Sequence, residues 1–547
     1  MLSLAPPDRT GPVGPSGILV AGTSSDAGKS VVVAGLCRAL VRRGIKVAPF
    51  KAQNMSNNSM VCLDGGEIGR AQYLQAQAAN VEPTTAMNPV LLKPGTDRRS
   101  FIVVRGEAAG TLEAGQYAAG RAHLADAAFA AYRELADAYE LVVCEGAGSP
   151  AEINLRSGDY VNMGLAREFG LPVVVVGDID RGGILASLYG TWALLDDDDR
   201  ALLKSFVINK FRGDVSVLEP GLAAITSRTG VPFHGVIPWL LDVWLDSEDT
   251  LEVGHWRAST ALSATSRERL RVAVIRLPRI SNATDVDALA AEPGVDVLVT
   301  IDPAVAESAD LLILPGSRST ASDLAWLRER GLADVVAGRV ARGRPVLGVC
   351  GGYQMLGQEI EDDIEGRVGI VPGLGHLPVR VEFGAVKVLA RPTGSWSGHQ
   401  VDTAYEIHHG IARRLSSDDG EGTDPLAAQP FLDGWSVGAV WGTMWHGALE
   451  SDDFRRAWLS QVAQTAGSQW QPEANALGFA QRRERMLDTL ADALEEHVDI
   501  DALLSFTRAT PPTTTPRNTP GTGQLGSVAT EAGCPLPGVL PGAGGVR

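Results

Sequence analysis

The chain has 547 residues, which is enough for about two or three domains with cores of their own. Its 48 basic and 65 acidic residues give a formal net charge of −17, which disfavours binding to nucleic acid or to an anionic membrane. No apolar run approaches the roughly 20 residues that span a bilayer, and the N-terminus lacks the pattern of a secretion signal. We therefore expect a cytoplasmic protein that binds neither nucleic acid nor membrane.

Two patterns that suggest metal sites are better explained otherwise. The five cysteines are odd in number, irregularly spaced and without a CxxC pair, which argues against a disulfide framework and against a zinc site. We interpret Cys37, Cys62 and Cys144 as packing residues. The acidic run Asp196–Asp199 is typical of a solvated loop after a helix that ends near Leu195.

The first structured segment predicts a phosphate-binding loop. The apolar strand pattern Gly17–Gly22 runs into a glycine loop that ends in Gly28, Lys29 and Ser30, and an apolar helix pattern follows. In such a loop the backbone N–H groups face phosphates, Lys29 neutralises them, and the Ser30 hydroxyl can ligate Mg²⁺. Five residues separate Gly22 from Gly28, one more than in the usual Walker A motif, and this variant resembles the loop of dethiobiotin synthetase and its relatives.

Three further apolar strand patterns each deliver a charged side chain at their carboxyl ends, where open α/β sheets bind ligands. They are Ile45–Phe50 before Lys51, Leu141–Cys144 before Glu145, and Leu171–Val176 before Asp178. The carboxylates of Glu145 and Asp178 are suited to bind Mg²⁺. We expect the Lys51 ammonium group to lie near the groups that react. Asp180 either holds metal or caps the next helix, and both interpretations stay open.

Strands alternate with helices from Gly17 to about Leu245, which predicts a mainly parallel sheet with crossover helices. A later strand, Phe206–Ile208, leads into Asn209, which resembles the base-contacting strand end of related P-loop proteins. We therefore expect an ATP-binding P-loop domain over residues 17–245, with Asn209 contacting adenine, after a loose lead-in over residues 1–16.

The segment Lys51–Ser59 is dense in amides and hydroxyls, so it is either a hydrogen-bonding surface for a polar ligand or an ordinary surface loop. Here a resemblance becomes specific. The first domain is similar to the cobyric acid synthase family, glutamine-dependent amidases of cobalamin biosynthesis. The motifs that carry this similarity are FKAQNMSNNS (50–59), GEIGRAQYLQAQAA (66–79), MNPVLLKP (87–94) and GDIDRGG (177–183).

A second domain is expected over residues 270–506, after a polar linker over residues 246–269. Its strand Asp310–Leu314 ends in the glycine turn PGSRST (315–320), which can present backbone N–H groups to an oxyanion or simply begin a helix. Residues 507–547 are rich in Thr, Pro and Gly and are expected to be disordered.

The second domain is organised around Cys350, which stands where a short apolar strand should turn sharply into a helix. Small residues on both sides, in the stretch Gly348–Gln354, permit the strained turn that exposes a nucleophile. A free thiol is mostly protonated at neutral pH, and N–H groups of the following helix would help to activate it. The alternative, that Cys350 is only a small buried hydrophobe, is less consistent with the flanking glycines.

A cysteine nucleophile needs a base, and His446 is the best candidate because Val437–Trp445 is predicted to form a strand with a bend that ends at His446, just before Gly447. His408 and His409 are its rivals. Together PGSRST, GVCGGYQ (348–354) and this late histidine resemble the class I glutamine amidotransferase family. Many members carry Glu two residues after the histidine, and here that position is Ala448. The partner that orients His446 is therefore open, and Glu406 is a substitute that only the sequence suggests.

The resemblance implies an α/β protein with a P-loop parallel-sheet domain followed by a class I glutamine amidotransferase domain. It implies an ATP- and Mg²⁺-dependent ligase that takes nitrogen from glutamine through Cys350 and His446. The implied corrinoid substrate is adenosylcobyrinic acid a,c-diamide, amidated at carboxylates b, d, e and g through acyl phosphates to give adenosylcobyric acid. Two alternatives stay open, a cobyrinic acid a,c-diamide synthase and a nucleotide-switch ATPase of the ParA or MinD kind, as does assembly into a homo-oligomer.

Overall fold

The computed structural model describes residues 17–94, 99–113, 122–240, 243, 269–415 and 428–507. All of these lie in one compact unit, Met1–Thr510. Three predicted segments lie wholly or almost wholly outside the described residues: the lead-in over 1–16, the linker over 246–269 and the tail over 507–547. We refer below to residues 17–240 as the first half and to residues 269–474 as the second half.

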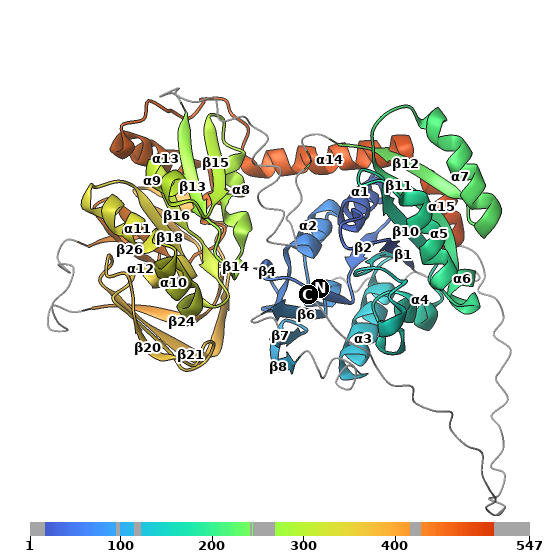
Figure 1. Cartoon of the computed structure of the whole chain (residues 1–547), viewed down its shortest axis with the longest axis horizontal. Helices are drawn as coiled ribbons and strands as arrows, with labels where there is room; N and C mark the ends of the chain where they lie inside the picture. Colours follow the sequence, from blue (N-terminus) through green and yellow to red (C-terminus); the bar gives the residue numbers. More distant parts are fainter. Residues whose placement is uncertain are drawn as a thin grey trace, which may run out of the picture. The chain divides into compact units, whose positions relative to one another are not determined.

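The first half is built on a six-stranded parallel sheet in the order β12-β11-β10-β1-β9-β2 (Figure 1). Its strands are β1 (Gly17–Gly22), β2 (Val47–Phe50), β9 (Leu141–Glu145), β10 (Val173–Asp178), β11 (Leu203–Phe211) and β12 (Phe233–Pro238). The helices between them are α1 (Lys29–Arg42), α3 (Ala122–Ala138), α4 (Met163–Phe169), α5 (Ile184–Leu194), α6 (Asp197–Leu202) and α7 (Val215–Thr229). The central strands are buried along their whole length because helices cover both faces of the sheet, and they are apolar up to Glu145 and Asp178 at the carboxyl ends of β9 and β10. The predicted parallel P-loop sheet is confirmed.

The amide-rich segment after β2 is not an ordinary surface loop. It forms β3 (Gln53–Met55) and the start of β4 (Ser59–Val61), and most of its side chains are buried. β3 lies at the edge of a small sheet in the order β3-β6-β7-β8, while β4 pairs with β5 just before α2. These elements are β5 (Glu67–Gly69), α2 (Arg70–Ala78), β6 (Val90–Pro94), β7 (Arg99–Val104) and β8 (Glu107–Glu113).

The second half is built on a seven-stranded sheet in the order β15-β13-β16-β18-β27-β26-β25, of which the last two strands are antiparallel to their neighbours. Its strands are β13 (Leu270–Ile275), β15 (Val295–Thr300), β16 (Leu311–Leu314), β18 (Val346–Val349), β25 (Gln429–Phe431), β26 (Gly434–Val437) and β27 (Val440–Thr443). The sequence predicted one bent strand over Val437–Trp445. The structure has a hairpin there, because Gly438 adopts a φ of 57° and turns the chain back.

A second sheet, in the order β20-β19-β21-β24, packs beside this one, and its strand β24 carries His408 and His409. Its strands are β19 (Glu359–Asp362), β20 (Gly369–Pro372), β21 (Val379–Ala390) and β24 (Glu406–Arg414). α12 (Gly351–Leu356) and α10 (Thr320–Glu329) follow the strand ends that were predicted to turn into helices. The predicted α/β class of both halves is confirmed.

The helix α14 (Phe479–His497), which the sequence assigned to the second domain, belongs to the core of the first sheet. Figure 1 shows α14 beside α1, and the fully buried Leu490 and Leu494 share a cluster with the outer face of β1. A Cβ on Gly35 of α1 would stand 2.8 Å from Leu494 Cδ2, so the close approach requires glycine. The amphipathic pattern of α14 predicted a buried face but could not say which core would bury it.

The acidic run Asp196–Asp199 follows a helix and is exposed at its first three residues, as predicted, but it begins α6 rather than a loop and its last residue is buried. Asp196 accepts a hydrogen bond from the backbone of Asp199 and caps α6. The Asp199 side chain is buried, and its Oδ1 lies 2.8 Å from Arg156 Nη2 and 2.6 Å from Arg167 Nε. Two guanidinium groups, rather than water, compensate the buried charge.

If α14 completes the first core, Leu494→Ala should lower the free energy of unfolding by about 2–4 kcal/mol, because it leaves a cavity against α1. Asp492→Ala, two residues away on α14, removes a partly exposed ion pair with Arg42 and should cost less than about 1 kcal/mol. Urea denaturation of the full chain measures both values. Equal losses for the two variants would contradict the packing.

Candidate active site

Cys350 lies at a strained turn between β18 and α12, with φ of 48° and ψ of −106°. A non-glycine residue with positive φ is uncommon, and here the surrounding glycines make the turn sterically accessible. A Cβ on Gly352 would stand 1.9 Å from the Leu314 carbonyl oxygen, and one on Gly351 would stand 2.6 Å from the Ser317 nitrogen. The thiol therefore sits on the tight strand-to-helix turn that the sequence predicted, and Cys350 is 5% exposed.

The glycine turn after β16 reaches the same place. β17 (Gly316–Ser317) pairs with β14 (Ile280–Ser281), and the Ser317 backbone lies directly against Gly351, the residue after the cysteine. A backbone N–H beside the nucleophile is what an oxyanion hole requires. The predicted placement of PGSRST near Cys350 is thus found in the structure.

His446 follows β27 and is held by a carboxylate that the sequence did not indicate. The Nδ1 atom of His446 lies 2.7 Å from Asp285 Oδ2, and the Gly447 N–H donates to Asp285 Oδ1 at 2.9 Å. Burial alone would lower the pKa of His446, but the Asp285 carboxylate and the Cys350 thiol raise that pKa to about 10. Nε2 makes no hydrogen bond to any residue that the structure describes, so it is the nitrogen left to exchange a proton with the thiol.

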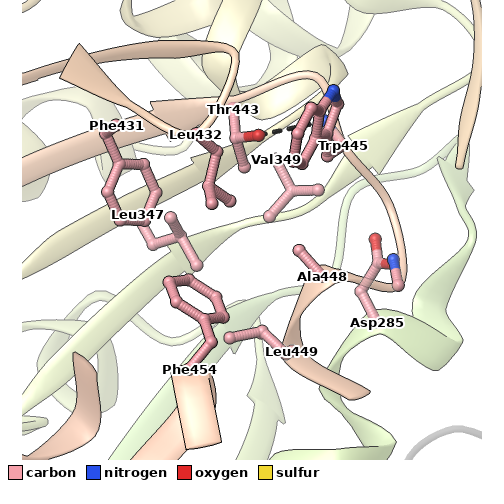
Figure 2. A pocket seen from close by; sticks show the side chains of 11 residues that line it. Asp285, Leu347, Val349, Phe431, Leu432, Thr443, Trp445, Ala448, Leu449 and Phe454 are labelled. Carbon is pink, nitrogen blue, oxygen red and sulfur yellow. Dashed lines mark hydrogen bonds between the residues drawn. The ribbon is translucent and has the colours of Figure 1, made fainter. Parts of the chain in front are cut away.

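Asp285 supplies a carboxylate to His446, which Ala448, two residues after the histidine, cannot. Figure 2 shows the Asp285 side chain beside Ala448, on the rim of an apolar pocket behind β18. The carboxylate thus reaches the histidine from a short helix, Ala283–Val286, rather than from two residues after it. Glu406, the substitute that the sequence suggested, instead lies 3.9 Å from His408 Nε2. The TDVD segment 284–287 carries no motif that would have identified Asp285.

The two rival histidines differ from His446 in their surroundings. His409 Nδ1 lies 3.1 Å from the Gly384 carbonyl oxygen, and burial lowers its pKa to about 4. His408 has no hydrogen bond at either ring nitrogen within the described ranges, and its nearest carboxylate is Glu406 at 3.9 Å. Of these three histidines, His446 alone combines a carboxylate at hydrogen-bond distance with an electrostatic interaction with Cys350, so it is the base that the geometry favours.

Cys350 opens into a polar pocket that residues of both halves line. The second half contributes most of the lining, including Arg318, Gln354, Glu365 and His408, and the first half contributes Asn57 and Lys93. Polar and charged groups around a nucleophilic thiol suit a small zwitterionic substrate.

A buried carboxylate, Glu67, joins the halves at the edge of this pocket. Glu67 forms ion pairs with Lys93 of the first half and Lys387 of the second. Burial alone would raise the pKa of Glu67, but the two ammonium groups hold it well below its usual range. Burial lowers the pKa of Lys93 to about 7 although Glu67 opposes that shift.

The predicted phosphate loop has the expected local geometry. Gly28 adopts a φ of 90° and no side chain caps α1, so the first N–H groups of the helix remain for a ligand. Lys29 Nζ donates to the carbonyl oxygens of Ser24 at 2.8 Å and Ser25 at 3.0 Å, which folds the ammonium group over the loop. A phosphate on these amides would lie within reach of the same ammonium group.

Glu145 lies at the centre of a buried polar cluster next to this loop. Its Oε1 accepts hydrogen bonds from Ser30 Oγ at 3.0 Å and Lys51 Nζ at 2.9 Å, while Gln75 donates to Oε2 at 2.5 Å. Burial alone would raise the pKa of Glu145, but Lys51 and the hydrogen bonds lower it, so the carboxylate stays ionised. Gln75 is a further polar residue of this site that the sequence did not single out.

Of the three predicted metal ligands, the structure brings Ser30 and Glu145 together. Asp178 instead lies 2.9 Å from Lys210 Nζ, and its other oxygen accepts from the Asp180 N–H at 2.8 Å. Among the described residues there is no group of three or more His, Cys, Asp or Glu that could hold a metal ion. A hydroxyl and one ionised carboxylate beside a phosphate loop do fit Mg²⁺ that takes its remaining ligands from phosphate and water.

Asn209, predicted to contact adenine, lies against the phosphate loop. Its Nδ2 donates to the Ala27 carbonyl oxygen at 3.1 Å, and a Cβ on Gly28 would stand 2.0 Å from the same nitrogen. Asn209 therefore braces the loop, and Gly28 is required for that contact.

Two family models match the chain in the order of its two halves. Residues 18–252 match the CobQ/CobB/MinD/ParA nucleotide binding domain, and residues 271–454 match the CobB/CobQ-like glutamine amidotransferase domain. No described helix is long and apolar enough to cross a membrane.

Curated relatives match over nearly their whole length. The chain is 63% identical over 496 residues to the cobyric acid synthase of Cutibacterium acnes, covering 90% of this chain and 100% of the relative. It is 55% identical over 509 residues to that of Streptomyces avermitilis, covering 92% and 99%. It is 54% identical over 512 residues to that of Mycolicibacterium gilvum, also covering 92% and 99%.

If Asp285 orients His446, Asp285→Asn should lower kcat for glutamine hydrolysis by about 10²–10⁴-fold, since the amide cannot stabilise the imidazolium. Glu406→Gln, which changes the rejected partner, should leave kcat within about threefold. Release of glutamate by the purified full chain measures both. An Asp285→Asn rate equal to that of the unsubstituted chain would contradict the pairing.

Proposed function

The chain belongs to the cobyric acid synthase family and catalyses glutamine-dependent amidation in cobalamin biosynthesis, and we propose that its two halves divide this reaction between them. The first half activates a carboxylate with ATP, and the second half releases ammonia from glutamine. The observation that carries the proposal is the buried series of contacts from Asp285 to His446 at the Cys350 turn, present in the same chain as a phosphate loop.

In the second half, we propose that the Cys350 thiolate attacks the side-chain amide carbon of glutamine. The oxyanion that forms is stabilised by backbone N–H groups such as that of Ser317, and His446 donates a proton to the departing nitrogen. Ammonia leaves as the carbon–nitrogen bond breaks, and a thioester remains on Cys350. Water, deprotonated by His446, hydrolyses this thioester to glutamate, while Asp285 keeps the imidazole oriented.

In the first half, the chemical problem is that a carboxylate has a poor leaving oxygen. Transfer of the γ-phosphoryl group of ATP to that oxygen gives an acyl phosphate, and ammonia then displaces phosphate to form the amide. Lys29 and the amides after Gly28 bind the phosphates, and Lys51 approaches the reacting oxygens. Ser30 and Glu145 would hold Mg²⁺, which supplies charge neutralisation when it is bound. Asp178 stays a proposed Mg²⁺ ligand, but its carboxylate would first have to separate from Lys210. Asn209 supports the phosphate loop through its hydrogen bond to Ala27.

For the acceptor, we propose the corrinoid adenosylcobyrinic acid a,c-diamide, amidated at carboxylates b, d, e and g. The support is the identity with cobyric acid synthases over nearly the whole chain. Synthesis of the a,c-diamide itself is not favoured by these relatives, and a nucleotide switch of the ParA or MinD kind does not account for the Cys350 half.

If the second half releases ammonia and the first half activates the carboxylate, variants of the two sites should differ in whether ammonium can replace glutamine. Cys350→Ala should abolish amidation with glutamine and retain amidation with ammonium, because free ammonia bypasses the thioester. Corrinoid amides formed with each nitrogen source, followed by mass spectrometry, measure the result. Cys62→Ala, which changes a buried thiol outside the site, is the matched control. Full activity of Cys350→Ala with glutamine would contradict the nucleophile.

Lys29→Ala should instead lower amidation by more than about 10²-fold with either nitrogen source, because phosphoryl transfer precedes the use of ammonia. The same assay, run with glutamine and with ammonium, measures it. Arg43→Ala, at the residue that follows the last turn of α1, is the control and should behave like the unsubstituted chain. Amidation that persists in Lys29→Ala would remove the phosphoryl-transfer role from this loop.

A further inference from the structure

The amide-rich segment of the first half is hydrogen-bonded to the turn that carries Asp285. The Ser59 N–H donates to Asn282 Oδ1 at 2.9 Å, and the Ala283 N–H donates to Asn58 Oδ1 at 3.2 Å. Each asparagine side chain thus accepts a hydrogen bond from the backbone N–H of the residue that follows the other asparagine. Asn58, Ser59 and Asn282 are all buried, so water does not compete for these bonds.

Asn282 determines how the chain enters the short helix Ala283–Val286. It adopts the left-handed conformation, with φ of 50° and ψ of 43°, and its carbonyl oxygen accepts from the Asp285 N–H at 3.1 Å. Asp285 follows three residues later and reaches His446. The position of the Asp285 carboxylate therefore depends on the turn at Asn282, which two hydrogen bonds join to the first half.

The other end of the same segment lies in the phosphate site. Lys51 immediately follows β2 and pairs with Glu145, whose carboxylate also accepts from Ser30. Between these ends, Asn54 Nδ2 donates to Gln72 Oε1 at 2.9 Å and fixes the middle of the segment on α2. One stretch of nine residues, Lys51–Ser59, therefore contacts the loop for phosphate and the turn that carries Asp285.

We propose that Asn58 and Asn282 are positioning residues for glutamine hydrolysis, which hold the Asp285 carboxylate against His446 from the first half. This inference rests on the proposed glutaminase role of Cys350 and His446. A displacement of about 1 Å in a catalytic constellation can cost about 10²-fold in rate, so two buried hydrogen bonds to the turn are enough to affect turnover. Asn282 also lines the Cys350 pocket, but among the contacts of the described residues neither asparagine is hydrogen-bonded to Cys350 or His446, and in this proposal each acts through Asp285.

The test compares two substitutions at Asn282. Asn282→Gly tolerates the left-handed conformation but removes the acceptor for Ser59, whereas Asn282→Asp keeps both a tolerated conformation and an acceptor oxygen. We expect Asn282→Gly to lower kcat for glutamine hydrolysis about tenfold with KM for glutamine within about twofold, and Asn282→Asp to restore kcat to within about threefold. Amidation with ammonium should be unchanged in both variants.

Asn58→Ala removes the acceptor of the Ala283 N–H and should lower kcat for glutamine hydrolysis in the same way. This second variant keeps the proposal testable if Asn282→Gly does not fold. Arg391→Ala is the matched control, because it breaks the exposed contact of Arg391 with Glu82, 3.4 Å away in the first half, without touching the Asp285 turn. An unchanged kcat in Asn282→Gly and Asn58→Ala, an equal loss in Arg391→Ala, or a parallel loss with ammonium would each overturn the positioning role. Failure of the proposed function itself is recognised separately, by glutamine-dependent activity of Cys350→Ala.

Discussion

The hydrogen bond between Asp285 and His446 is the interaction on which the second half depends. A histidine in a fully buried site would ordinarily stay neutral. Its single ring proton could then lie on either Nδ1 or Nε2. The carboxylate removes both freedoms, because it accepts a hydrogen bond from Nδ1–H and favours the imidazolium. The strained turn carries the Cys350 thiol, and Asp285 supplies the carboxylate that Ala448 cannot.

Both sites contain the same arrangement, a buried carboxylate that accepts hydrogen bonds from several elements. Asp285 is held by His446 and by the backbone after it, and Glu145 is held by Ser30, Lys51 and Gln75. In each case the desolvation cost is offset by fixed donors that lie in place without any ligand. Sites arranged in this way need little reorganisation when charge develops during the reaction.

The features that the sequence predicted correctly are those with a local physical cause. The turn at Cys350 follows from glycines beside a short apolar strand, and the phosphate loop follows from Gly28, Lys29 and Ser30 between a strand and a helix. Asp285 could not be predicted, because its role depends on a contact across 161 residues and it has no spacing relative to His446 that a motif records. Long-range packing likewise determines which hydrophobic core contains α14. The amphipathic pattern of α14 predicts which helix face is buried, but not which sheet that face packs against.

The return of α14 to the first sheet has a consequence for how the protein is made. During synthesis the first half leaves the ribosome early, with α1 and its apolar face already formed but the side chains that cover this face still several hundred residues away. The apolar face of α1 must stay exposed without aggregating until Phe479–His497 emerges from the ribosome. By then the whole second half has been synthesised and is able to fold. The nucleotide-binding sheet is thus the first part of the enzyme to be translated and one of the last to be complete.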